Sequence, residues 1–226
     1  MRIATLMLLL MLAGLAGSVL LNSAFFDVTL IEVYGTVRLQ KEEVIAASLL
    51  MPGTRIWNVS PSSTEALVES LVWVKDARVQ LVLPATVRIR ITERTPMALV
   101  PEGQAFLLVD ADGVVLERTE DVSDVTLPLI TGVVPGDDPR PFQWADDCLK
   151  MLAERAIEVS EVNVSGGSIT AYLMDGTRVL LGEYDLQLKD KIELLEQILK
   201  DVKRDKIAVS YVDLRYPNKP VIRLQQ

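Results

Sequence analysis

The sequence predicts an α+β protein in which one N-terminal transmembrane helix precedes a body of two small mixed domains and a final edge strand. Three observations carry this prediction. The first twenty or so residues are almost wholly apolar, and the rest of the chain mixes apolar with polar residues. Helix-like and strand-like patterns alternate along that second part. About 200 residues follow the apolar segment, enough for one large domain or two small ones.

The apolar segment is Ile3–Leu21, nineteen residues without a charge. At helical rise it spans about 28 Å, close to the ~30 Å hydrocarbon core of a bilayer. Arg2 precedes the segment and Asp27 follows it, so the positive-inside rule predicts that the body is exported from the cytoplasm. We expect a cytoplasmic stub at residues 1–2 and a membrane span at 3–22. A cleaved signal peptide is the alternative, although its apolar region usually has only about 7–15 residues.

Composition excludes several classes of function. The net charge of -8 argues against nucleic acid, whose binding needs clustered Lys and Arg. The chain has no histidine, which removes the usual general base and most zinc sites. Its single cysteine, Cys148, lies on the apolar stripe of a predicted helix and is expected to be a buried core thiol. Paired carboxylates remain formally available, but the acids fall in turns and on helix faces. We therefore expect no enzyme, no metal site and no cofactor.

The residue pattern in the first part of the body predicts one strand, then two helices, then two strands. Their ranges are 26–34, 40–50, 62–71, 73–83 and 86–92. Gly35 ends the first strand, and Pro52-Gly53 ends the first helix, whose inward side is expected to include Leu49. In the last strand apolar residues alternate with Arg88 and Arg90, which predicts one buried face and one wet face.

The second part predicts a mixture of strands and helices. Strands are expected within 106–116 and at 159–164, 169–174, 177–181, 208–216 and 221–224, and helices at 142–156 and 186–202. The first helix is expected to carry Trp144, Cys148 and Ala156 inward. Asp110-Ala111-Asp112-Gly113 lacks the later ligands of a calcium loop, so we predict a turn instead.

Certain residues of this pattern are shared with a known family. In the first part they are Phe26, Val28, Ile31, Val33, Gly35, Gly53, Ile56, Trp57, Trp73, Val74, Ala77, Val79, Leu83-Pro84, Val87, Ile89, Glu93, Arg94 and Pro96. This segment resembles a POTRA domain, most closely that of the FtsQ/DivIB family of bacterial cell-division proteins. The second part, with its tail Tyr211–Tyr216, resembles the β domain that follows POTRA in that family. The resemblance implies a POTRA domain at 26–96 and an FtsQ-type β domain at 97–226.

The resemblance also implies a function. Family members are non-enzymatic scaffolds of the inner membrane at the division septum, where they help to control septal peptidoglycan synthesis. They bind FtsB-like and FtsL-like coiled-coil proteins and other divisome proteins, and a C-terminal edge strand accepts the FtsB segment. That role is carried over onto Arg215, Tyr216, Asn218, Val221, Ile222, Arg223 and Leu224. The alternative is that Tyr216 packs on its own hairpin while Arg215 sits in solvent.

A second partner face is expected on the POTRA domain. The resemblance implies that the domain docks other division proteins through the edge strand 86–92, where Arg88 and Arg90 on the wet face would meet an acidic partner. Equally, both would act as gatekeeper charges on an exposed strand. Two other functions compete with the scaffold. One is another POTRA-containing exported transport or assembly factor; such a protein would be expected to have tandem POTRA repeats. The other is a cell-wall enzyme that acts through paired carboxylates.

Overall fold

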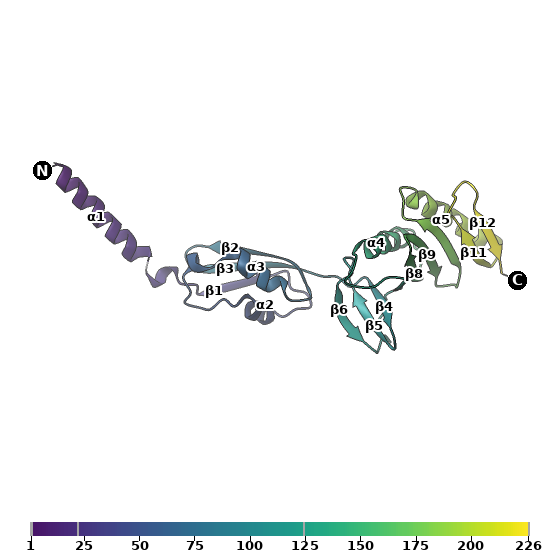
Figure 1. The fold of residues 1–226 in the computed structure, drawn as a ribbon, viewed down its shortest axis with the longest axis horizontal. Helices are drawn as coiled ribbons and strands as arrows, with labels where there is room; N and C mark the ends of the chain where they lie inside the picture. Colours follow the sequence, from purple (N-terminus) through teal and green to yellow (C-terminus); the bar gives the residue numbers. More distant parts are fainter. Residues whose placement is uncertain (1, 22, 124, 226) are drawn as a thin grey trace. The chain divides into compact units, whose positions relative to one another are not determined.

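A computed structural model describes residues 2–21, 23–123 and 125–225 (Figure 1). At positions 2–4, 16 and 19–21 only the backbone is described. The chain divides into two compact units, unit 1 (Met1–Arg94) and unit 2 (Thr95–Gln226).

The N-terminal segment of unit 1 is helical. Helix α1 covers Arg2–Leu21, and a short 3-10 turn at Ala24–Phe26 follows it. Part of the predicted membrane span at 3–22, including Asn22, lies outside the described residues. Counting only what the structure describes, no helix is both long and apolar enough to cross a membrane.

The rest of unit 1 is a three-stranded sheet with two helices. Its elements are β1 (Leu30–Tyr34), α2 (Lys41–Ser48), α3 (Pro61–Glu69), β2 (Val74–Val82) and β3 (Thr86–Glu93). The predicted order of strand, helix, helix, strand, strand is confirmed. Helix α3 packs along β2 and α2 packs on β1. The sheet order is β1-β3-β2, with β3 parallel to β1 and antiparallel to β2.

Two expectations for unit 1 are wrong. Strand β3 is central and not an edge strand, because β1 pairs with the side of β3 that the β2–β3 hairpin leaves open. Alternation along 86–92 reports only that one face is buried, and Val87, Ile89 and Ile91 are indeed buried. Leu49 does not belong to the inward side of a helix. It follows the end of α2 with φ 53° and is 68% exposed.

Glu93, the last residue of β3, holds the loop that follows β1. Its carboxylate accepts backbone N–H groups from Val37, Arg38 and Leu39, each at 2.9 Å. Partial burial of the carboxyl opposes its ionisation, but the three donors outweigh burial and lower the pKa of Glu93 below its ordinary value. One ionised side chain thus fixes three consecutive backbone donors.

We expect Glu93→Gln to destabilise unit 1 by about 1–3 kcal/mol at neutral pH, because the amide keeps one neutral acceptor oxygen in place of two charged ones and turns an NH2 donor toward a backbone N–H. A carboxyl whose pKa is lowered by folding stabilises the fold above its unfolded pKa. That contribution is lost as the pH falls through the folded value. The variant should therefore lose less stability than the natural chain between pH 7 and pH 3. Urea unfolding followed by tryptophan fluorescence measures both effects. Exposed Glu42 is the control, and equal sensitivity of Glu42→Gln would contradict the assignment.

Unit 2 contains a nine-stranded mixed sheet and two helices. Its strands are β4 (Ala98–Glu102), β5 (Ala105–Val109), β6 (Val115–Thr119), β7 (Leu129–Thr131), β8 (Val159–Ser165), β9 (Ser168–Leu173), β10 (Arg178–Glu183), β11 (Val209–Asp213) and β12 (Val221–Leu224). Its helices are α4 (Arg140–Ala153) and α5 (Leu188–Asp205). The strand order is β12-β11-β10-β9-β8-β7-β4-β5-β6. Strands β4 and β7 were not predicted; β7 has three residues, too few to show a period.

Helices α4 and α5 cover one face of this sheet, where α4 packs on β8 and α5 on β10 (Figure 1). The core between them contains fully buried Phe142, Ile192 and Leu195. Ala156 is exposed, with φ 55°, because α4 ends at Ala153, so the prediction that it points inward is wrong. The predicted turn at 110–113 is confirmed, since Asp110 accepts the backbone N–H groups two and four residues ahead, at 3.0 and 2.9 Å.

Cys148 belongs to the same core and is fully buried, as predicted. Burial, with a smaller contribution from the negative charge of Asp147, raises the pKa of the Cys148 thiol to about 12. A thiol with so high a pKa is protonated at neutral pH and makes a poor nucleophile.

Candidate partner-binding edge

Strand β12 forms one end of the nine-stranded sheet. It pairs antiparallel with β11 on one side, and in the part of the chain that the structure describes no strand pairs with its other side. All four of its residues are exposed. Such an edge presents free backbone donors and acceptors to another chain.

The outward backbone groups follow from alternation along the strands. Gln225 donates its N–H to Ala208 of the neighbouring chain segment at 2.8 Å, and Leu214 donates to Leu180 of β10 at 2.8 Å. Successive residues of an antiparallel pair turn their backbone groups to opposite sides. Val221 and Arg223 therefore direct their backbone N–H and C=O groups toward β11. Ile222 and Leu224 direct theirs toward the open edge.

The side chains of β12 alternate between the two faces of the sheet. Ile222 lies opposite Val212, a fully buried core residue, and so belongs to the face that the helices cover. Leu224 shares that face, and the two side chains are 41% and 53% exposed. Val221 and Arg223 lie on the other face. The strand thus offers two uncovered apolar side chains on one face and a cation on the other.

The predicted residues of the β11–β12 turn lie beside this edge. Arg215 is held by the carboxylate of Asp213, with 2.7 Å between Nη2 and Oδ2. The hydrogen bond from the Arg215 side chain is the main cause of a lowered pKa of Asp213, and the same contact raises the pKa of Arg215. Asn218 is exposed. Tyr216 is 75% exposed, so its ring is not packed on its own hairpin.

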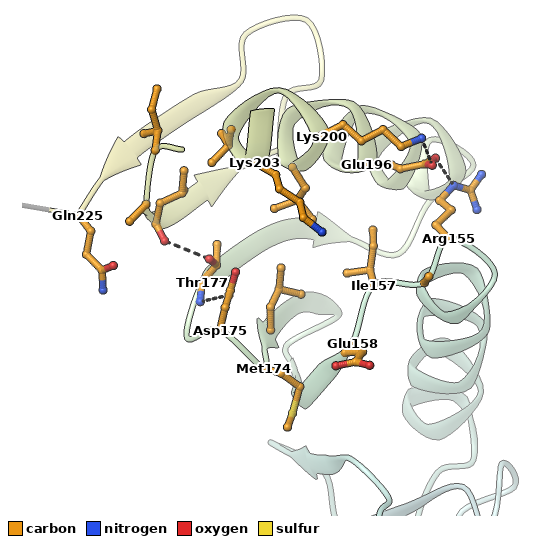
Figure 2. Close-up of a pocket in the computed structure, with 17 residues that line it drawn as sticks. Arg155, Ile157, Glu158, Met174, Asp175, Thr177, Glu196, Lys200, Lys203 and Gln225 are labelled. Carbon is orange, nitrogen blue, oxygen red and sulfur yellow. Dashed lines mark hydrogen bonds and ion pairs between the residues drawn. The ribbon is translucent and has the colours of Figure 1, made fainter. Parts of the chain in front are cut away.

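A groove of about 650 Å³ opens beside the end of β12, where Gln225 forms part of its wall (Figure 2). Ile157 and Met174 contribute apolar surface to it, on segments that follow α4 and β9. Three of its charged side chains bind one another: Glu196 pairs with Lys200 and, at 3.6 Å, with Arg155. Its lining has three basic residues, Arg155, Lys200 and Lys203, and three acidic ones, Glu158, Asp175 and Glu196, so it carries no net charge. Among the described residues, no three acidic or thiol groups are placed to hold a metal ion.

The structure also places the two arginines of unit 1. Arg88 forms an ion pair with Glu32 at 2.9 Å, and its guanidinium lies 5.8 Å from the ring centroid of Tyr34. The hydrogen bond to Glu32 is the main cause of the raised pKa of Arg88. Arg90 is exposed between Tyr34 and Arg78, its cross-strand neighbours. Both lie on a sheet face, not on an edge.

Sequence reasoning did not predict the contacts that two acidic residues of α3 make with β2. Glu65 accepts the backbone N–H of Val79 at 2.8 Å, and Glu69 accepts that of Ala77 at 3.0 Å. Both donors belong to β2, an edge strand of unit 1, so carboxylates already occupy part of that edge. The spacing of the two glutamates, one helical turn apart and just before a strand, is the signal that was available.

Comparison with known proteins agrees with the two units. A family model described as POTRA domain, FtsQ-type, matches residues 26–94. The model for Cell division protein FtsQ/DivIB, C-terminal, matches residues 98–215, which is more than half of the chain.

Individual relatives point the same way. Cell division protein FtsQ of Syntrophotalea carbinolica is 29% identical over 238 residues, covering 99% of this chain and 83% of the relative. The FtsQ of Geotalea daltonii is 26% identical, covering 91% and 78%. A solved extracytoplasmic domain of DivIB from Geobacillus stearothermophilus aligns with 50% of this chain and 97% of its own, at 20% identity and a TM-score of 0.35. Because the FtsQ/DivIB C-terminal family model matches more than half of its residues, the chain belongs to the FtsQ/DivIB family of bacterial cell-division proteins.

Proposed function

We propose that the protein is a non-enzymatic scaffold of the divisome. Ile3–Leu21 anchors it in the lipid bilayer of the cytoplasmic membrane, and the body lies outside the cytoplasm at the division septum. It binds FtsB-like and FtsL-like coiled-coil proteins by strand addition at β12, contacts other divisome proteins, and so helps to control septal peptidoglycan synthesis.

The observation that carries this proposal is the open edge of β12, with the backbone groups of Ile222 and Leu224 turned outward. An extended segment added there gains main-chain hydrogen bonds, while flanking side chains give specificity. Tyr216 supports the proposal because an exposed tyrosine beside an open edge is a typical anchor at protein interfaces. Family membership supports the role in division, and the uncharged segment Ile3–Leu21 supports the anchor.

Deleting residues 217–226 tests the proposal. The natural chain, purified from membranes of its own organism with an affinity tag, should carry small coiled-coil proteins that mass spectrometry identifies. The truncated chain should remain folded by circular dichroism and lose them. Arg88→Ala with Arg90→Ala, on unit 1, is the control and should keep them. If the folded truncated chain retains these proteins, strand addition at β12 is wrong and unit 1 becomes the better candidate.

A further inference from the structure

We infer that the strand added at β12 carries a carboxylate side chain beside Arg223, between two apolar side chains that cover Ile222 and Leu224. This inference rests on the proposed strand addition. It goes further because it states the chemistry of the partner strand and which residue of this chain selects it.

The first support is a row of side chains across the sheet face opposite α4 and α5. Strand register puts five residues side by side, one each from β8 to β12: Glu161, Tyr172, Arg178, Tyr211 and Arg223. The order is an acid, a ring, a cation, a ring and a cation. Among the described residues Arg223 is the last of the row, so a strand added at β12 would supply its next neighbour.

The second support is the charge of that row. In the part of the chain that the structure describes, neither Arg178 nor Arg223 forms an ion pair with a carboxylate. Glu161 lies at the far end and accepts the hydroxyl of Thr131 at 2.5 Å. Asp213 lies two residues after Tyr211 on β11, next to the row, and Arg215 already binds its carboxylate.

The guanidinium of Arg223 lies 5.8 Å from the ring centroid of Tyr211, which holds it over the sheet face. A side chain directly opposite on an added strand would have its Cβ about 4.5–5.5 Å from that of Arg223. At this separation an opposite charge stabilises the pair and a like charge destabilises it. A planar guanidinium also matches the two oxygens of a carboxylate.

The sheet face that α4 and α5 cover determines which residue types flank this carboxylate along the added strand. Side chains along a strand alternate between faces, so the residues on either side of it point to the face of Ile222 and Leu224. Both of these apolar side chains are about half exposed, and apolar neighbours would remove that area from water. The expected pattern is apolar, acidic, apolar. It holds for a parallel or an antiparallel strand, because alternation does not depend on direction.

Charge reversal tests the inference. The full chain in detergent is titrated with the FtsB-like protein of the same organism. Arg223→Glu should weaken binding about tenfold, because an attractive cross-strand pair becomes a repulsive one. Lys219→Glu makes the same change of charge in the adjacent turn, outside the row, and should alter affinity less than about twofold.

Reversing each acid of the partner strand in turn to lysine should reveal one position that restores binding to Arg223→Glu. Deletion of 217–226 distinguishes a failure of the proposed strand addition at β12 from a failure of the inferred contact between Arg223 and an acid. If the deletion leaves binding intact, the proposed function fails. If the deletion abolishes binding but Arg223→Glu binds like the natural chain, or no partner acid restores it, strand addition stands and this inference is overturned.

Discussion

Ile222→Pro should weaken partner binding by roughly 5- to 150-fold, because an unpaired carbonyl on the incoming strand costs about 1–3 kcal/mol. Ile222 turns its N–H to the open edge, so the substitution removes a donor from the interface and none from the β11–β12 ladder. The proline ring also stands where the added backbone must approach. Titration of the full chain with the FtsB-like protein measures the loss.

Two variants control this result. Ile222→Ala keeps the N–H and should lose only the contribution of part of an apolar side chain. Arg223→Pro removes an N–H that faces β11 and should destabilise the hairpin itself, which circular dichroism and thermal unfolding would reveal. If Ile222→Pro binds as well as Ile222→Ala, the added strand does not use this backbone group.

Gly35→Ala should destabilise unit 1 by about 2–6 kcal/mol, since it combines backbone strain with steric overlap. Gly35 has φ +90°, which other residues rarely adopt, and an added Cβ would lie 2.0 Å from the carbonyl oxygen of Ile91 in the central strand. Neither backbone can move without breaking the pairing of β1 with β3. Thermal and urea unfolding of the full chain measure the effect.

Gly53 provides a matched control, because it has φ +88° and nothing lies within 4 Å of an added Cβ. Gly53→Ala should cost only the backbone strain, about 1–3 kcal/mol. A Gly35→Ala chain that unfolds no earlier than Gly53→Ala would show that the overlap is relieved. The core of unit 2 is separate, so Gly35→Ala should leave partner binding at β12 unchanged.

The alternation along 86–92 shows what a sequence reveals about a strand. It correctly predicted that Val87, Ile89 and Ile91 are buried, because a period of two follows from which face meets the core. It said nothing of whether the strand is central, since that depends on β1, more than fifty residues earlier. Strand β4 escaped prediction because Pro101 interrupts its apolar run, a feature that argues against a strand.

The candidate site divides in the same way. Residues 221–224 were recognisable as a short, late strand, and their exposure agrees with an edge. The row from Glu161 to Arg223 was not recognisable, because it joins five strands whose register no local pattern records. The same holds for Glu65 and Glu69, whose contacts with β2 form only when the helix docks.

The thiol of Cys148 gives the chain a practical advantage. It is the only cysteine in the sequence, it is fully buried, and its pKa is about 12, so maleimides and disulfide reagents at neutral pH meet hardly any thiolate. A cysteine introduced at an exposed position of β12 would thus be the single reactive handle on an otherwise natural chain. Spin labels, fluorophores or zero-length cross-links placed there would report directly on what touches this edge in a dividing cell.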